Sequence, residues 1–263
     1  MAGIRPVAIV GLVRELQASA APLKPLQVSG VLAEQLARDL RAGGEERLVR
    51  VGGDPASAAA LVVVLGGAAT EEDERLLRAA RRARTPAIAV QTGRDADLDV
   101  PYVLATDVVV CPPGEGFPVE RIAEALAARL GEEGTQLAAR LPVLRGPVCR
   151  WLIASFSRRN GLIGTIVFVP GADLPALTLN QLRLVLRIAA AHGVEIDEQR
   201  APEILATVGG GFLFRALARE VLGFVPVAGW AIKGAIAYAG TQALGQGAMR
   251  RFAAGPLSVR SRS

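Results

Sequence analysis

Short apolar runs rich in valine and isoleucine alternate with helical patterns along the first half of the chain. The runs predict four buried strands and a weaker fifth, at residues 6–11, 61–66, 86–91 and 102–110, and at 47–51. Apolar residues recur at helical spacing between them, at residues 29–42, 71–84 and 118–130. Strands that alternate with helices favour a mostly parallel sheet with helices on both faces.

The helix expected at 71–84 has the clearest start in this half. Thr70 is a suitable N-cap residue, and Asp73 follows three residues later, as in a capping box. Five arginines follow on the same helix, and we interpret them as a solvated face with basic residues near the helix C-terminus rather than as a binding patch. They are Arg75, Arg78, Arg81, Arg82 and Arg84.

The second half of the chain has helical patterns without strand signals. Residues 170–193 predict a helix with Thr178 as its N-cap, Gln181 as the partner in a capping box, and Gly193 as the C-cap glycine. His192 lies beside that C-cap, where its side chain would stabilise the helix end, and the sequence offers it no catalytic partner.

Three apolar stretches in this half raise the question of a membrane. Residues 151–156 and 162–170 are each too short to cross a bilayer and are separated by the polar segment 157–160, so they predict either an interfacial hairpin or two packed segments. Residues 221–245 are long enough for one span, although Pro226 and Lys233 interrupt them. Glycines at 229, 234, 240 and 245 would allow close helix contact, so a buried bundle helix remains an equal alternative.

Charge divides the 263 residues into two parts. Residues 1–144 hold 16 Lys and Arg against 19 Asp and Glu, whereas residues 145–263 hold 14 against 6. Mean hydropathy is +0.35 and aromatic residues are 4% of the chain. Basic residues among long apolar stretches favour an anionic lipid surface as a partner of the second part, and the scarcity of aromatics disfavours nucleic acid. We expect an N-terminal domain at 1–140 and a C-terminal helical domain at 141–263.

The remaining composition excludes several classes of site. Cys111 and Cys149 are the only cysteines and His192 is the only histidine, so no zinc site is expected, and the thiols are interpreted as reduced in a cytoplasmic protein. Arg14 and Glu15 interrupt the first apolar patch, which disfavours a signal peptide. No cofactor is expected.

The N-terminal half resembles a degenerate GTPase domain. Residues 61–95 follow the order of a GTPase's later elements, and AVQTGRD at 89–95 matches the base-reading motif [Asn/Thr]-Lys-x-Asp at Thr92 and Asp95, with Gly93 in place of the lysine. No phosphate-binding G-x-x-x-x-G-K-[ST] sequence follows the run at 6–11. The resemblance therefore implies a pseudo-GTPase, with Thr92 and Asp95 as the residual nucleotide-binding candidates, and we expect no GTP or ATP hydrolysis.

The C-terminal half resembles a second family in three blocks over residues 145–253. The blocks are the P-x-A-D-L-P-x-L-T-x-x-Q run, GGGFLFRALAREVLGFVPVAGW, and AYAGTQALGQGAMRRF. Together they look like DUF697, a bacterial family of unknown function that is often fused to GTPase domains and related to inner-membrane YcjF-like proteins. The resemblance implies a GTPase as a protein partner and supplies no catalytic residue.

These observations predict an α/β domain followed by a helical domain. The expected function is non-enzymatic: a membrane-associated or GTPase-partnering scaffold or regulatory protein, located in the cytoplasm at the inner face of the cell membrane. The alternative is a guanine-nucleotide switch with an atypical phosphate site. Candidate residues for membrane or partner contact are arginines that flank the apolar stretches or lie on a charged helix face: Arg158, Arg159, Arg215, Arg219, Arg250 and Arg251.

Overall fold

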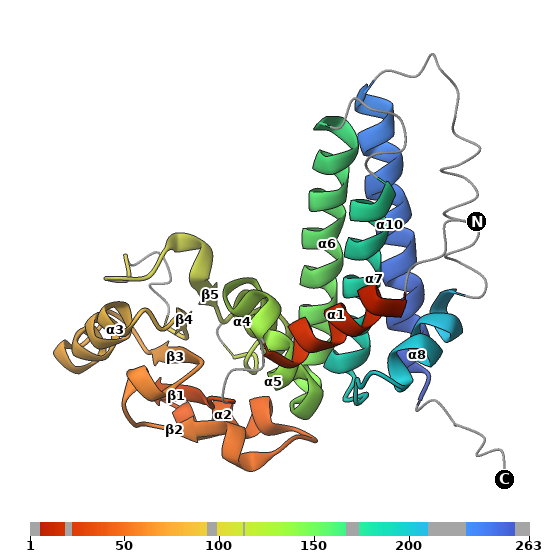
Figure 1. The fold of residues 1–263 in the computed structure, drawn as a ribbon. Helices are drawn as coiled ribbons and strands as arrows, with labels where there is room; N and C mark the ends of the chain where they lie inside the picture. Colours follow the sequence, from red (N-terminus) through yellow and green to blue (C-terminus); the bar gives the residue numbers. More distant parts are fainter. Residues whose placement is uncertain are drawn as a thin grey trace, which may run out of the picture. The chain divides into compact units, whose positions relative to one another are not determined.

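The computed structural model describes residues 6–18, 23–93, 99–112, 114–166, 174–209 and 230–255. Its contacts divide the chain into two compact units (Figure 1). The α/β unit comprises residues 21–148, and the helical unit comprises residues 149–263 together with residues 1–20. The expected division at 140/141 thus differs in two respects: the N-terminal helix belongs to the helical unit, and eight further residues belong to the α/β unit.

The α/β unit contains a five-stranded, all-parallel sheet with the order β2-β1-β3-β4-β5. This is one of the two common orders of doubly wound sheets. The expected α/β class with a C-terminal helical region is confirmed. The strands are β1 (Leu26–Gly30), β2 (Val49–Val51), β3 (Ala60–Leu65), β4 (Ala87–Gln91) and β5 (Val108–Val110).

Helices cover both faces of this sheet. Leu61, Val63 and Leu65 of β3 pack against Leu77 and Ala80 of helix α3 (Glu71–Ala83). Alternation along β3 turns its other residues towards the opposite face, which α2 (Ala33–Arg41) and α4 (Val119–Leu130) cover. Short elements complete the unit: α5 (Gly134–Arg140) and the 3-10 turns η1 (Glu46–Leu48), η2 (Pro55–Ser57), η3 (Ala105–Asp107) and η4 (Gly131–Glu133).

The first expected strand is wrong. Residues 6–11 begin helix α1 (Pro6–Ala18), in which Leu12 and Val13 are buried. The real first strand, β1, was missed because Gln27 and Ser29 break its apolar pattern, although both are buried. A short apolar run cannot by itself distinguish a strand from a buried helix. The runs at 61–66 and 86–91 are confirmed as β3 and β4, and those at 47–51 and 102–110 contain the shorter β2 and β5.

The capping box predicted for α3 is confirmed. Thr70 Oγ1 accepts a hydrogen bond from the Asp73 backbone N–H at 3.2 Å, and Asp73 Oδ2 accepts one from the Thr70 N–H at 3.0 Å.

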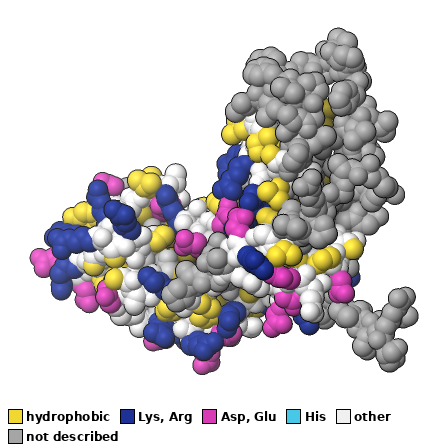
Figure 2. All heavy atoms as spheres, viewed as in Figure 1, with side chains coloured by type: hydrophobic (Ala, Val, Ile, Leu, Met, Phe, Trp, Pro, Cys, Tyr) yellow, Lys and Arg dark blue, Asp and Glu magenta, His cyan; other side chains and the backbone are white. Residues whose placement is uncertain are grey.

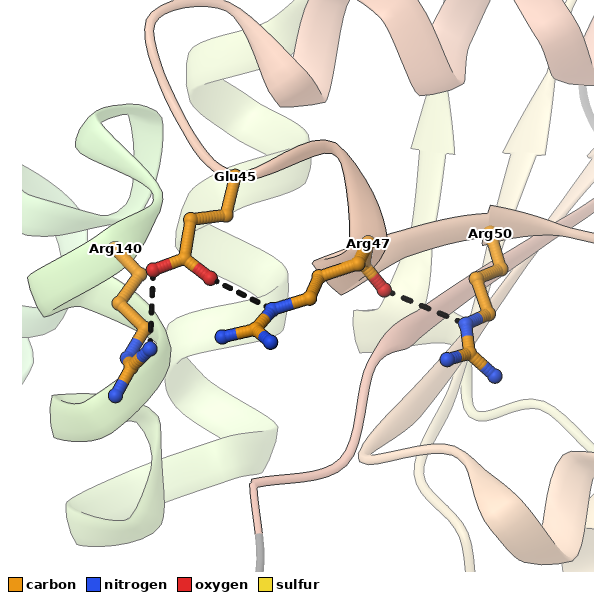
Figure 3. A network of polar contacts seen from close by, with 4 residues as sticks. All are labelled: Glu45, Arg47, Arg50 and Arg140. Atoms are coloured by element: carbon orange, nitrogen blue, oxygen red, sulfur yellow. Dashed lines mark hydrogen bonds and ion pairs between the residues drawn. The ribbon is translucent and has the colours of Figure 1, made fainter.

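One carboxylate joins distant parts of the α/β unit (Figure 3). Arg47 Nε donates to Glu45 Oε2 at 2.9 Å, and Arg140 Nη1 donates to Glu45 Oε1 at 3.0 Å. Partial removal from water raises the pKa of Glu45, but the hydrogen bonds and charges of the two arginines outweigh it and hold the pKa below 4.5. The pair Glu45–Arg140 therefore fastens the end of α5 to the turn that precedes β2.

The helical unit is a bundle of long helices. Helix α10 (Trp230–Ala253) packs against α7 (Leu174–Ala191) and α8 (Arg200–Gly209), and α1 packs against α8. Helix α6 (Pro142–Ile166) begins in the α/β unit and ends in the helical unit. Ion pairs hold α1 on the bundle: Arg14 with Glu198 at 3.1 Å, and Glu15 with Arg183 at 2.7 Å.

Two expectations for this unit need correction. The segments 151–156 and 162–170 are not separate as far as Ile166, because the continuous helix α6 contains both up to that residue together with the polar residues between them. Residues 167–170 lie outside the described residues. Thr178 is not an N-cap: α7 begins four residues earlier, and Pro175, whose fixed φ suits a first helical turn, lies inside it. Of the apolar stretch 221–245, residues 221–229 lie outside the described residues. Among the described helices, none combines the length and hydropathy needed to cross a bilayer.

The expected end of α7 is confirmed. Gly193 has φ 80°, and its N–H donates to Ala190 O at 2.9 Å. His192 Nδ1 lies 2.9 Å from Ile188 O, so the imidazole satisfies one of the last carbonyls of the helix.

Candidate functional site

The carboxyl edge of a doubly wound sheet is where such folds bind ligands, so we consider it first. Thr92, at the end of β4, uses its hydroxyl internally: Oγ1 donates to Leu65 O at 3.1 Å. The next residue, Gly93, lies so close to β3 that a Cβ there would be 2.5 Å from Gly66 O. A lysine at position 93 therefore does not fit this backbone. Asp95 lies outside the described residues.

The phosphate-binding sequence is absent after the real first strand as well. β1 ends at Gly30 and is followed by Val31, Leu32 and Ala33, without lysine, serine or threonine. Lys24 precedes β1, and its Nζ donates to Ala56 O at 3.1 Å. Within the described residues, this edge of the sheet therefore offers no lysine, serine or threonine side chain that is placed to bind a nucleotide.

A second candidate lies in the helical unit, where three large apolar side chains are exposed. Leu162 near the end of α6 is 61% exposed, and Ile236 and Tyr238 near the start of α10 are 45% and 39% exposed. We call these three residues the apolar tip. Exposed large apolar side chains that share one region of a surface are typical of an interaction site.

Close packing of α6 on α10 places the part of α6 next to Leu162 against the part of α10 that carries Tyr238. The helices run antiparallel, because Gly161 approaches Gly234 and Tyr238 whereas Gly245 approaches Ile153. A Cβ on Gly234 would lie 2.8 Å from Gly161 O, so the two backbones nearly touch. The expectation of close helix contact is therefore confirmed at two of the predicted glycines, Gly234 and Gly245, whereas Gly240 meets nothing within 4 Å.

Two of the predicted arginines lie one helical turn from the tip. Arg158 and Arg159 are exposed on α6, at positions i−4 and i−3 from Leu162, so they share its side of the helix. The guanidinium of Arg159 lies 5.2 Å from the ring centroid of the buried Phe156. Basic and hydrophobic side chains lie next to each other over α6 in Figure 2.

The other predicted arginines do not join this group. Arg250 and Arg251 are exposed in the last turns of α10, twelve or more residues beyond Tyr238, which is about 18 Å along a helix. Arg215 and Arg219 lie outside the described residues. The structure thus separates a tip pair, Arg158 and Arg159, from a distal pair, Arg250 and Arg251.

A chain of polar side chains runs through the bundle beneath the tip. Asn160 Nδ2 donates to Thr241 Oγ1 at 2.8 Å, and Asn180 Nδ2 donates to Asn160 Oδ1 at 3.0 Å. Arg183 continues the chain from Asn180, at 3.4 Å, to Glu15 of α1, at 2.7 Å. Asn160 and Thr241 are fully buried. A connected buried network of this kind specifies the register of its helices, here α6, α7 and α10.

The two thiols do not form a reactive site. Burial, together with the charge of Glu115, raises the pKa of Cys111 above 9.0. Cys149 is fully buried, and its Sγ lies 3.9 Å from His192 Nδ1, the atom that contacts Ile188 O. Sequence reasoning gave His192 no side-chain partner, and the structure adds this thiol. Within the described residues, no group of three potential metal ligands occurs.

In comparisons with known proteins, no protein-family model and no curated protein matches the chain.

Sequence reasoning named the arginines of α6 but missed the apolar tip. A usable signal was present, because residues 158–162 read Arg-Arg-Asn-Gly-Leu, with the charged pair one turn before an apolar residue. Because residues 157–160 were interpreted as a break between two elements, the helical spacing of Arg158 and Arg159 relative to Leu162 was not considered. The pairing of Gly161 of α6 with Gly234 of α10, more than 70 residues away, has no local signal.

Proposed function

We propose that the chain is a non-enzymatic scaffold that binds the surface of an anionic membrane through the apolar tip of its helical unit. Leu162, Ile236 and Tyr238 would enter the headgroup region, and Arg158 and Arg159 would contact lipid phosphates. The observation that carries the proposal is the exposed tip with two exposed arginines one helical turn away on α6.

The dimensions fit an interfacial rather than a spanning contact. Four residues of α6 separate Leu162 from Arg158, which is about 6 Å along the axis. Elements that lie in the membrane interface bury their apolar residues by about 5–10 Å. Arginine also reaches towards the phosphates with its apolar stem buried, and tyrosine favours the interface between lipid and water.

The magnitudes predict weak, reversible binding. Each arginine near an anionic surface contributes about 1 kcal/mol. The three partly exposed apolar residues contribute about 1 kcal/mol each. A total of about 5 kcal/mol corresponds to a dissociation constant of somewhat under 1 mM. Stable attachment therefore requires a second contact, as for other interfacial anchors.

A protein partner would supply that second contact. The resemblance of residues 145–253 to DUF697, and of residues 61–95 to the later elements of a GTPase, supports a GTPase as the partner and the cytoplasmic face of the cell membrane as the location. The alternative of a guanine-nucleotide switch lacks comparable support, because Thr92 is bonded internally and Gly93 has no room for a side chain.

Flotation of the full chain with vesicles tests the proposal. Wild type should float with vesicles that contain anionic lipid, and high salt should remove only the electrostatic part of the binding. Replacing the tip pair (Arg158→Gln with Arg159→Gln) should weaken binding about 30-fold, from the loss of about 2 kcal/mol. Leu162→Ser with Ile236→Ser should remove the part that persists at high salt.

The distal pair supplies a matched control. Arg250→Gln with Arg251→Gln removes the same charge from the same unit and should weaken binding much less than the change at the tip pair. Equal losses from the two pairs would mean that net charge alone drives binding, and the tip would have no special role. A wild-type chain that ignores anionic vesicles at low salt would refute membrane binding.

A further inference from the structure

A second surface of unusual composition lies on the α/β unit, around the side chain of Tyr102. The guanidinium carbons of Arg78 and Arg81 lie 5.5 and 5.7 Å from the centroid of its ring. Arg78 Nε also donates to the Tyr102 hydroxyl at 3.2 Å. Leu104 follows on the same loop. We call Arg78, Arg81, Tyr102 and Leu104 the Tyr102 surface.

The loop displays its apolar residues instead of burying them. Tyr102 is 40% exposed and Leu104 is 62% exposed, whereas Val103 between them packs against the core of the unit. Tyr102 also has φ 66°, a left-handed conformation that is unfavourable for an aromatic residue. A helix face that only needs solvation requires neither a strained tyrosine nor an exposed leucine. The sequence predicted that the α3 arginines only form a solvated face. That interpretation did not include the exposed Tyr102 and Leu104 beside them.

Within the described residues, the charge of this surface is positive and only partly compensated. Arg78 has an ion pair with Glu74 at 4.0 Å. For the other arginines of α3, no carboxylate of the described chain lies within ion-pair distance, and all of them are exposed. Figure 2 shows basic side chains gathered over α3 on the visible face. Each guanidinium carries five N–H donors, and the described residues engage only a few of those of Arg78 and Arg81.

We propose that the Tyr102 surface docks an acidic segment of a partner protein, whose carboxylates bind Arg78 and Arg81 and whose apolar side chain covers Leu104. Tyrosine and arginine are the residues most enriched at protein–protein binding hot spots. Stacking on Tyr102 also holds the two guanidiniums in place before binding, which reduces the entropy lost on association. The proposal concerns the α/β unit and does not rest on membrane binding by the helical unit.

The neighbouring charges favour a protein segment over lipid or nucleic acid. Four carboxylates fill the first turn of α3, one to three turns from the arginines: Glu71, Glu72, Asp73 and Glu74. A bilayer or a polynucleotide presents negative charge over a wide area and would meet this turn as well. A peptide can place its acidic residues on the arginines alone.

Fluorescence anisotropy with a labelled peptide of alternating Glu and Leu tests the proposal on the full chain at low salt. Arg78→Gln with Arg81→Gln should weaken binding about tenfold or more. The control Arg38→Gln with Arg121→Gln removes the same charge from exposed arginines on α2 and α4, and binding should change less than about twofold. Arg78→Lys with Arg81→Lys retains the charge but weakens the stack, and an intermediate loss is expected.

The apolar contact has its own readout. Leu104→Ser should weaken binding of the Glu–Leu peptide but leave binding of a Glu–Ser peptide unchanged. The proposal is overturned if the wild type does not bind the Glu–Leu peptide, or if both arginine pairs reduce binding equally. It is also overturned if anionic vesicles or an oligonucleotide of equal charge compete as well as the peptide does. Unchanged melting temperatures would show that the variants are folded.

Discussion

Gly93 is the residue at which the structure departs most clearly from a guanine-binding motif. A Cβ at this position would lie 2.5 Å from the backbone carbonyl oxygen of Gly66, the residue that follows β3. Gly93→Ala should therefore lower the free energy of unfolding by about 1–3 kcal/mol, as overpacking usually does. Urea denaturation of the full chain measures the change through the transition of the α/β unit.

Gly67→Ala is the matched control for this prediction. It makes the same chemical change in the adjoining loop, where a Cβ meets nothing within 4 Å, and its effect should lie within about 0.5 kcal/mol of zero. If both substitutions are neutral, the close approach of the two backbones is not a constraint. A lysine at 93 would then be tolerated, and the missing motif residue would have no structural cause.

Glu45 gives the α/β unit a predictable dependence on pH. Its pKa is held below the ordinary value of 4.5 by Arg47 and Arg140, so near pH 4 the folded chain binds fewer protons than the unfolded chain. The stability that Glu45 contributes is therefore present above pH 4.5 and is lost as the pH falls through its folded-state pKa. Glu45→Gln should lower the urea midpoint at neutral pH, and the difference from the wild-type midpoint should shrink as the pH falls through the folded-state pKa of Glu45.

The neighbouring residue Glu46 separates this effect from a general loss of negative charge. Glu46→Gln removes one carboxylate from the same turn but none of the contacts in Figure 3. At neutral pH, the urea midpoint of Glu46→Gln should differ less from the wild-type midpoint than that of Glu45→Gln does. A difference in urea midpoint between Glu45→Gln and wild type that stays constant as the solution is acidified would contradict the role of the ionised carboxylate.

At the scale of the element, two glycines of α10 should respond to alanine with opposite signs. A Cβ on Gly234 would lie 2.2 Å from Thr165 Oγ1 and 2.8 Å from Gly161 O, so Gly234→Ala must push α6 and α10 apart. Gly240 meets nothing within 4 Å, and alanine is favoured over glycine in a helix by about 1 kcal/mol. Gly240→Ala should raise the melting temperature of the helical unit, and Gly234→Ala should lower it.

A calorimetric scan of each full-length variant measures both effects. Destabilisation by both substitutions would indicate that α10 contacts something along the side of Gly240 in solution. Stabilisation by both would show that the contact with Gly161 yields easily. In that case the close crossing would not be what positions the apolar tip.

Elements with strong local signals were predictable from the sequence, and those decided by tertiary burial were not. β3 is a continuous run of apolar residues, and Thr70 with Asp73 marks the start of α3, so both follow from local rules. β1 contains Gln27, whose buried side chain is satisfied by Gly53 O at 2.9 Å. That carbonyl lies 26 residues away, so no window of sequence around β1 reveals why a glutamine is tolerated there.

The candidate site was predictable only in its charged half. Arg158 and Arg159 stand out in an apolar stretch, which is why the sequence indicated them. The apolar half depends on which side chains of α6 and α10 remain uncovered after packing. Leu152 and Leu162 are equally apolar, yet the first is fully buried and the second is exposed. The polar residues 157–160 also suggested a break, although buried hydrogen bonds from Asn160 hold them inside a continuous helix.

At the scale of the whole molecule, the α/β unit is inserted into the helical unit. Helix α1 precedes the sheet in sequence but belongs to the bundle, where the exposed Glu15 pairs with Arg183 and ends the chain of polar side chains. The chain therefore leaves the bundle after α1 and returns to it within α6. Domain insertions of this kind are tolerated because the ends of compact domains often lie close together.

The inserted unit should fold by itself when it is cut where its contacts end. Residues 21–148 include Leu141, Leu144 and Val148, all fully buried, whereas a fragment cut at 140 lacks them. Removing one large buried aliphatic side chain costs about 2–5 kcal/mol, so losing three exceeds most of the stability of a small domain. Fragment 21–148 should thus unfold in one cooperative urea transition, and fragment 21–140 should show none. If both fragments unfold with the same urea midpoint and cooperativity, the unit ends near residue 140. The first turns of α6 would then contribute nothing to its core.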